Sequence, residues 1–196
     1  NINHRGAKPL GDVLDEFDDA RLDGYVQGRG RLVGVGRIPQ LHGAVGPGQC
    51  QAAVVQKGHG VQGVARLVGM SVPGTPATDA EAVDLLEREF GRTSFHFIHF
   101  KAPDARGEDK DFDAKVAAIE AVDAFVARLA ALSPDVIAVT GDHSTPASMG
   151  VHSWHHVPLL LASRWARPTG SSFSETSCRL GDLGVLESKH LMGLML

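Results

Sequence analysis

Apolar residues recur along the chain with two periods, one typical of helices and one typical of strands. The clearest helical period lies in DFDAKVAAIEAVDAFVARLAAL (111–132), where apolar side chains are spaced by three or four residues: Phe112, Val116, Ile119, Val122, Val126 and Leu129. This spacing predicts an amphipathic helix, which Ser133 and Pro134 end. Shorter helical patterns occupy 61–70 and 78–90, the second with Thr78 and Glu81 in capping-box register.

Short apolar runs between these helices predict strands at QAAVV (51–55), FHFIHF (95–100), DVIAVT (135–140) and VPLLLAS (157–163). Strands that alternate with helices predict an α/β domain with a mostly parallel sheet. The preceding stretch, GYVQGRGRLVGVGRIPQLHGAVGPG (24–48), is dense in glycine and predicts loop with at most short strands. We therefore expect residues 1–50 to be a connector or the remnant of a preceding region, and 51–196 to carry the domain.

Composition narrows the class of protein. The chain has 196 residues, 43% of them hydrophobic and 21% charged, which is typical of a globular domain. A net charge of −4 gives no basic surface for nucleic acid or anionic lipid. No apolar run reaches the roughly 20 residues of a membrane span, and the first residues lack a signal peptide. Two cysteines make no disulfide framework or zinc pattern, and we expect a cytoplasmic protein.

Polar clusters border three of the predicted strands. KAPDARGEDKD (101–111) follows the strand FHFIHF, GDHSTP (141–146) follows DVIAVT, and VHSWHH (151–156) lies just before VPLLLAS. In sheets of this class, ligands bind beyond the carboxyl ends of the strands. We therefore expect the first two clusters to meet at one edge of the sheet, with the third looping back to them.

These clusters contain carboxylates and imidazoles but no thiolate: Asp104, Glu108, Asp142, His143 and His152. Oxygen and imidazole ligands suit Mn²⁺ or Zn²⁺, and suit Mg²⁺ less well. The set is large enough for a two-metal site of the kind that promotes phosphoryl transfer. The residues alone are also consistent with a hydrogen-bonded Asp-His pair at a strand end. The acidic run is equally consistent with a solvated helix start capped by Asp109 or Asp111. His96 and His99 are consistent with structural roles.

The quoted segments resemble the archaeal type of cofactor-independent phosphoglycerate mutases, which belong to the alkaline phosphatase superfamily. The matching stretches are 95–123 and 135–163, with looser matches at 51–70 and 181–196, and TGDHSTP with the following HS and VP is the most specific part. The resemblance implies a three-layer, alkaline-phosphatase-like α/β fold with a mostly parallel sheet flanked by helices, present as a partial domain.

The resemblance also implies two divalent metal ions, Mn²⁺ or Zn²⁺ with Mg²⁺ as a further option. One ion would be bound by Asp104 and His152, with Glu108 where most members have His. The other would be bound by Asp142 and His143. It would also need an Asp from the first strand and a nucleophilic Ser or Thr, neither of which has a counterpart in this chain, so no catalytic residue is assigned. His155 and His156 match no ligand, and we expect them in the loop with Trp154 packed beside them.

The activity that the resemblance implies is the interconversion of 3-phosphoglycerate and 2-phosphoglycerate through a phosphoserine. The partner would be a small phosphorylated substrate, and no nucleic acid or membrane is expected. Because the nucleophile is missing, we expect the chain to be the C-terminal portion of a longer enzyme and to be inactive alone. A metal-dependent phosphatase of the same superfamily and a catalytically silent metal-binding domain remain as alternatives. The metal and the oligomeric state stay open.

Overall fold

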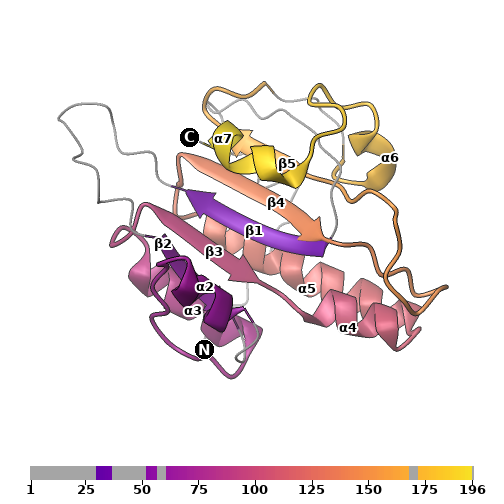
Figure 1. The fold of residues 1–196 in the computed structure, drawn as a ribbon, viewed down its shortest axis with the longest axis horizontal. Coiled ribbons are helices and arrows are strands. Elements are labelled where there is room, and N and C mark those ends of the chain that lie inside the picture. Colours follow the sequence, from indigo (N-terminus) through magenta and orange to yellow (C-terminus); the bar gives the residue numbers. More distant parts are fainter. Residues whose placement is uncertain (1–29, 37–51, 57–60, 168–171, 196) are drawn as a thin grey trace, which may run out of the picture.

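A single five-stranded sheet organises the protein (Figure 1). The computed structural model describes residues 30–36, 52–56, 61–167 and 172–195. The strands follow the spatial order β2-β3-β1-β4-β5. Their bounds are Gly30–Gly36 for β1, Ala52–Gln56 for β2, Phe95–His99 for β3, Val136–Asp142 for β4 and Leu160–Ser163 for β5. The four strands that the sequence predicts are therefore present, and β1 is an additional one.

The direction of the strands agrees only partly with a mostly parallel sheet. Strands β2, β3 and β4 point the same way, but β1 pairs antiparallel with both β3 and β4, and β5 pairs antiparallel with β4. Only the β2–β3 pair is parallel. The helical crossover from β3 to β4 leaves these two strands parallel but one strand apart, and β1 fills the gap. The expected pairing is thus corrected to a mixed sheet.

Strand β1 arises from the glycine-rich stretch in which the sequence predicts loop with at most short strands. Its seven residues, GRLVGVG, pair along both edges, so it is the central strand of the sheet. Glycine weakens the intrinsic preference for a strand, but a segment placed between two partner strands gains hydrogen bonds on both sides, and such context overrides propensity.

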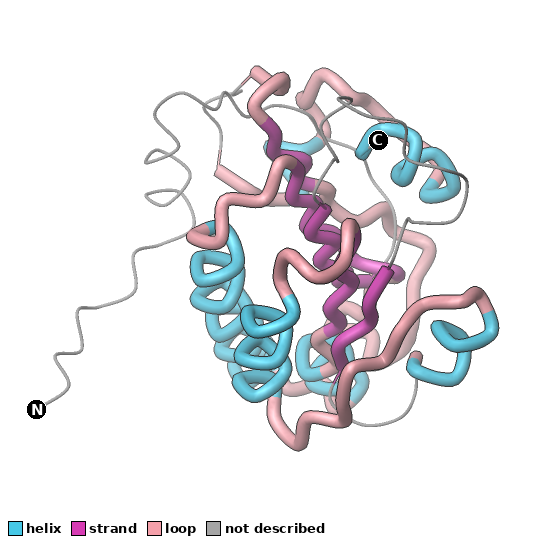
Figure 2. Tube along the Cα trace, turned by 90° about the vertical axis from the view of Figure 1, so that its left-hand side faces the viewer, coloured by secondary structure: helices cyan, strands magenta, loops and turns pink. Residues whose placement is uncertain are grey.

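The described helices cover both faces of the sheet (Figure 2). Their bounds are Gln62–Leu67 for α2, Asp79–Glu89 for α3, Ala102–Glu108 for α4, Phe112–Ala130 for α5, Glu175–Cys178 for α6 and Leu191–Met195 for α7, with a 3₁₀ turn at Ser188–His190. Helices α3 and α5 pack on one face through Leu86 and Leu129, against Ile98 and Ile137. On the other face, Met195 of α7 packs against Val136, Ala138 and Leu159. The three-layer α/β class predicted from the sequence is confirmed.

Local signals place the ends of two helices correctly. The Thr78 side chain accepts a hydrogen bond from the Glu81 backbone N–H at 3.1 Å, and the Glu81 carboxylate accepts one from the Ala77 N–H at 2.8 Å. At the start of α5, the Asp111 carboxylate accepts from the Ala114 N–H at 2.9 Å. The chain leaves α5 through Ser133, whose φ of 55° breaks the helical backbone. No described helix is both long and apolar enough to cross a membrane.

The apolar face predicted for α5 is buried only in its C-terminal half. Val122, Val126 and Leu129 lie in the core, whereas Phe112 is 68% exposed and Val116 is also exposed. The first turns of α5 lie beside α4, beyond the ends of the strands (Figure 1). Helical periodicity identifies a continuous stripe, but only contact with the sheet decides how much of the stripe is buried.

His96 of β3 is a fully buried structural residue, as the sequence predicts. Its ring stacks on Phe90 with centroids 5.6 Å apart, and the Thr93 hydroxyl lies 3.1 Å from its Nε2. Burial lowers the pKa of His96, opposed only in part by the Thr93 hydrogen bond and the charge of Glu89. The folded protein therefore keeps this imidazole neutral to a lower pH than the unfolded chain does.

Acid should for this reason destabilise the fold. Above about pH 6.5 both states carry a neutral His96, and below it the unfolded state binds the proton first, so folding loses up to about 1.4 kcal/mol per pH unit. Urea unfolding from about pH 7.5 to about pH 5.5 should show a shallower pH dependence for His96→Gln than for the parent chain. An equal slope in both proteins would contradict this assignment.

Candidate metal centre

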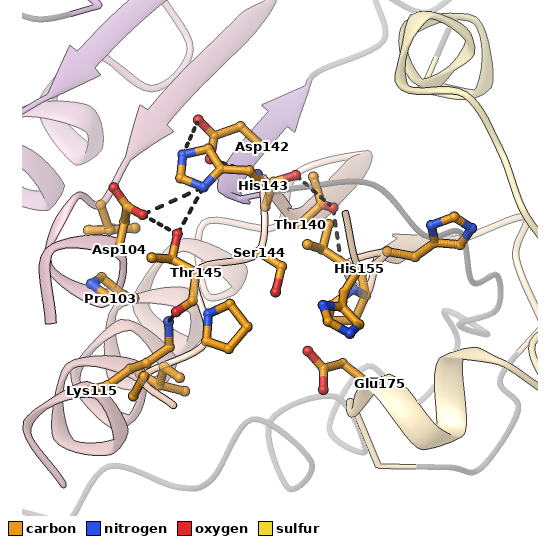
Figure 3. A pocket seen from close by; sticks show the side chains of 18 of the residues that line it. Pro103, Asp104, Lys115, Thr140, Asp142, His143, Ser144, Thr145, His155 and Glu175 are labelled. Atoms are coloured by element: carbon orange, nitrogen blue, oxygen red, sulfur yellow. Dashed lines mark hydrogen bonds and ion pairs between the residues drawn. The ribbon is translucent and has the colours of Figure 1, made fainter. Parts of the chain in front are cut away.

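The predicted clusters converge at one edge of the sheet, as expected from the direction of β3 and β4. Strand β3 ends at His99, and α4 then presents Asp104 in its first turn. Strand β4 ends at Asp142 and leads directly to His143. The segment 151–156 loops back, because the Ser153 N–H donates to the Ser144 carbonyl at 2.8 Å. A pocket of about 910 Å³ opens at this edge (Figure 3).

Three of the predicted ligands form a compact group. Asp104, His143 and His152 each offer a ligand atom, and these atoms lie within 4.8 Å of one another. Oδ1 of Asp104 is 3.5 Å from Nδ1 of His143 and 3.6 Å from Nε2 of His152. The two imidazole rings are tilted by 31° to each other, with centroids 3.7 Å apart. The 3.6 Å contact between Asp104 and His152 is short enough for two ligands of one cation, since two atoms each about 2.1 Å from an ion lie at most about 4.2 Å apart.

The other two predicted ligands extend this group at both ends. Oε1 of Glu108 lies 3.5 Å from Nε2 of His152, and Oδ2 of Asp142 lies 3.6 Å from Nε2 of His143. These contacts link all five into one group, called the row below, in the order Glu108, His152, Asp104, His143 and Asp142, and the rings of His152 and His143 also contact each other. Asp142 also accepts a hydrogen bond from the His143 backbone N–H at 3.1 Å, so the hydrogen-bonded pair considered from the sequence exists inside the row.

The carboxylate of Asp104 is held by two hydrogen-bond donors that do not belong to the row. Lys101 Nζ donates to its Oδ2, and the Thr145 hydroxyl donates to its Oδ1. Burial by itself raises the pKa of Asp104, but these hydrogen bonds and the charge of Lys101 outweigh it and hold the pKa below its usual value. The same hydrogen bond raises the pKa of Lys101. The carboxylate is therefore ionised and is already stabilised by a cation in the protein.

Sequence reasoning missed the residues that support Asp104. Lys101 had a local signal, because it stands three residues before Asp104 at a helix start and faces it. Thr145 lies inside the quoted TGDHSTP run, yet nothing in the run assigns it a partner. The role of Lys115 could not be predicted from local sequence, because its Nζ donates at 2.6 Å to the carbonyl of Thr145, which lies thirty residues away in the chain.

His155 and His156 lie outside the row of ligands. Both line the pocket, and His155 stacks on Trp154 with centroids 5.0 Å apart, which confirms the expected packing. Nδ1 of His155 lies 2.8 Å from the Ser153 hydroxyl oxygen. Their positions agree with the prediction that they belong to the loop.

The rest of the pocket wall combines apolar and charged side chains. Phe112, Ile119, Met149 and Phe173 supply apolar surface, and Lys115, Glu175 and Arg179 supply charge. In Figure 3, Glu175 of α6 lies across the pocket from Asp104. The thiol of Cys178, which precedes Arg179 in the sequence, is buried, and burial raises its pKa to about 12. The pocket can hold a small polar molecule next to the row.

Comparison with known protein families shows which family the chain belongs to. Residues 62–196, which include the whole row, match the metalloenzyme superfamily. The chain belongs to the metalloenzyme superfamily. Within this superfamily, 34% of aligned residues are shared with a protein of Thermotoga petrophila described as "Probable 2,3-bisphosphoglycerate-independent phosphoglycerate mutase". That alignment covers 100% of this chain and 47% of the relative.

Other metalloenzyme relatives agree with this one. A Thermus thermophilus protein with the same description is 45% identical over 69% of this chain and 34% of its own length. Among solved structures, the PH0037 protein from Pyrococcus horikoshii is similar with a TM-score of 0.64 and 34% identity, over 74% of this chain and 47% of that one. The resemblance found in the sequence is confirmed, and the chain spans less than half the length of these relatives.

Proposed function

We propose that the chain is the metal-binding part of a phosphoglycerate mutase that interconverts 3-phosphoglycerate and 2-phosphoglycerate. The observation that carries the proposal is the row of five candidate ligands beside a pocket, in a chain whose curated relatives are described as phosphoglycerate mutases. The substrate is a small phosphorylated acid, and the reaction passes through a phosphoserine whose serine is not assigned in this chain. A cytoplasmic location stays a prediction.

The donor set fits one divalent ion, Mn²⁺ or Zn²⁺, and supplies two ligands toward a second. Glu108, His152 and Asp104 would bind one ion, and Asp142 with Nε2 of His143 would bind the other. Divalent ions in such sites lower the pKa of a nucleophile and stabilise charge on the oxygens of a transferring phosphoryl group. Asp104 and Asp142 supply negative charge that attracts the cations, and the pocket next to them orients the substrate.

Metal binding is tested by two histidine variants from the same loop. His152→Ala should weaken Mn²⁺ or Zn²⁺ binding, measured by calorimetry, by about 100-fold, because a ligand is lost outright and even changes beyond the first ligands cost 10–100-fold. His155→Ala is the matched control and should bind as the parent chain does. Equal losses in both would show that the wrong histidine is assigned.

The reaction is tested with a chimera, because this chain spans only part of its relatives. Residues 62–196 would replace the matching segment of the Thermotoga petrophila protein, and the product would be assayed with 3-phosphoglycerate and enolase, with and without Mn²⁺. Metal-dependent formation of 2-phosphoglycerate supports the proposal. Free phosphate without 2-phosphoglycerate would favour a phosphatase, and metal binding without either product a silent domain. The chain alone should show no turnover.

A further inference from the structure

Thr145 occupies the centre of the site without being a metal ligand. Its side chain is only 3% exposed, although it lies in a loop. Its carbonyl oxygen accepts from Lys115 Nζ of α5 at 2.6 Å, and its backbone packs directly against Gly107 of α4. Contacts with α4 and α5 therefore hold the backbone of Thr145 in place independently of its hydroxyl.

The hydroxyl of Thr145 joins two candidate ligands from different elements. It donates to Oδ1 of Asp104 on α4, and its oxygen lies 3.0 Å from Nδ1 of His143 after β4 (Figure 3). A threonine hydroxyl has one proton to donate, and an ionised carboxylate can only accept. With that proton directed at Asp104, the oxygen can only accept from His143. Nδ1 of His143 must then carry the proton.

The consequence concerns the opposite nitrogen of the ring. In a neutral imidazole, protonated Nδ1 leaves a lone pair on Nε2. Nε2 of His143 faces Oδ2 of Asp142 at 3.6 Å, where the two atoms can share an ion. Hydrogen bonds made by the far nitrogen commonly fix the tautomer and orientation of a metal-binding histidine. In this protein the partner of Nδ1 is the Thr145 hydroxyl, and that hydroxyl is in turn hydrogen-bonded to a second candidate ligand, Asp104.

We propose that Thr145 is a positioning residue that fixes the Nδ1–H tautomer and ring orientation of His143 while holding Oδ1 of Asp104. This inference rests on the proposed metal site, but it makes a claim about the metal-free protein as well. The hydroxyl prepares both residues before an ion arrives. Its removal therefore costs metal affinity without removing a ligand.

The test compares two substitutions at Thr145 with one at a neighbouring threonine. Thr145→Val keeps the shape and removes the hydroxyl, whereas Thr145→Ser keeps the hydroxyl and removes the methyl group. Thr140→Val is the matched control, because the Thr140 hydroxyl is also buried but donates to the Pro158 carbonyl at 3.0 Å. The ¹⁵N shifts of the His143 ring in metal-free protein report the tautomer, and calorimetry with Mn²⁺ or Zn²⁺ alone reports the affinity.

We expect Thr145→Val to lose the defined Nδ1–H tautomer and to bind metal about 10–100-fold more weakly. Thr145→Ser and Thr140→Val should keep both properties. An unchanged tautomer in Thr145→Val would overturn the inference. So would an equal loss in Thr145→Ser, which would assign the effect to packing of the methyl group. If the valine variant fails to fold, an Nε2–H tautomer of His143 in the parent chain would overturn the inference.

Failure of the proposed function has a different signature. If the parent chain bound neither Mn²⁺ nor Zn²⁺, the metal site would be wrong. The ring shifts of His143 would still decide the role of Thr145, because they are measured without metal.

Discussion

Replacing Asp104 with Asn is expected to weaken the binding of Mn²⁺ or Zn²⁺ by more than about 100-fold. This loss exceeds the roughly 10–100-fold loss of affinity that follows when a residue hydrogen-bonded to a ligand is replaced. Asp104 stands in the middle of the row, with Oδ1 within 3.6 Å of both His143 and His152. Asparagine preserves the shape of the side chain but removes its charge. Its NH₂ group replaces one of the two oxygens, so the side chain can accept only one of the hydrogen bonds that Lys101 and Thr145 donate to the carboxylate. The substitution therefore removes a charged ligand and leaves one of these donors without its acceptor.

Asp109 provides the matched control for this experiment. It follows the last residue of α4, and its exposed carboxylate accepts from Arg106 at 2.9 Å, away from the row. Asp109→Asn removes the same charge from the opposite end of the same helix and should leave the affinity unchanged in a calorimetric titration. Equal weakening by both substitutions would mean that general negative charge, and not a defined ligand, attracts the cation.

The ion pair between Lys101 and Asp104 predicts a further effect of metal binding. A partly buried carboxylate is stabilised by a compensating charge, and Lys101 supplies it in the absence of metal. A divalent ion bound at Asp104 would repel the Lys101 ammonium group. Metal binding should therefore weaken or displace this ion pair, and the affinity includes the free energy of that exchange.

Local chemistry explains why parts of the fold were predictable from the sequence. Thr78 was predicted as a cap, and Asp111 as one of two candidates with Asp109, because a capping side chain bonds within three residues of itself. The five candidate ligands were predicted because their donor types are visible in the sequence and their segments match those of the family that the chain resembles. The helical crossover between β3 and β4 makes these two strands run in the same direction, so the approach of Asp104 and Asp142 to one edge of the sheet was also predictable.

Long-range partnership explains what the sequence could not predict. The sequence of β1 resembles a loop, and only the gap between β3 and β4 makes it a strand. Lys115 is one cation among many until the fold places its Nζ on the Thr145 carbonyl. Phe112 continues the apolar stripe of α5, but the sheet ends before it. In each case the deciding interaction joins residues far apart in the chain.

Gly107→Ala is expected to reduce both stability and metal affinity, because α4 and the Thr145 loop touch at this glycine. A Cβ at Gly107 would overlap the Thr145 carbonyl oxygen and would lie 2.8 Å from Lys115 Nζ and 3.0 Å from Thr145 Cγ2. The closest obstacle is backbone, which cannot rotate away as a side chain can. Overpacking of this kind costs about 1–3 kcal/mol. The shift would also carry the Thr145 hydroxyl away from Asp104 and His143.

Gly63 is the control that separates this clash from the general effect of alanine in a helix. It lies in α2, and no atom within 4 Å would meet a Cβ there. Gly63→Ala should therefore be neutral or stabilising by up to about 1 kcal/mol, from helix propensity alone. Urea unfolding and calorimetric titration of both variants should show joint losses of stability and affinity at Gly107 only. Full affinity in Gly107→Ala would show that the ligands are placed independently of the contact between α4 and Thr145.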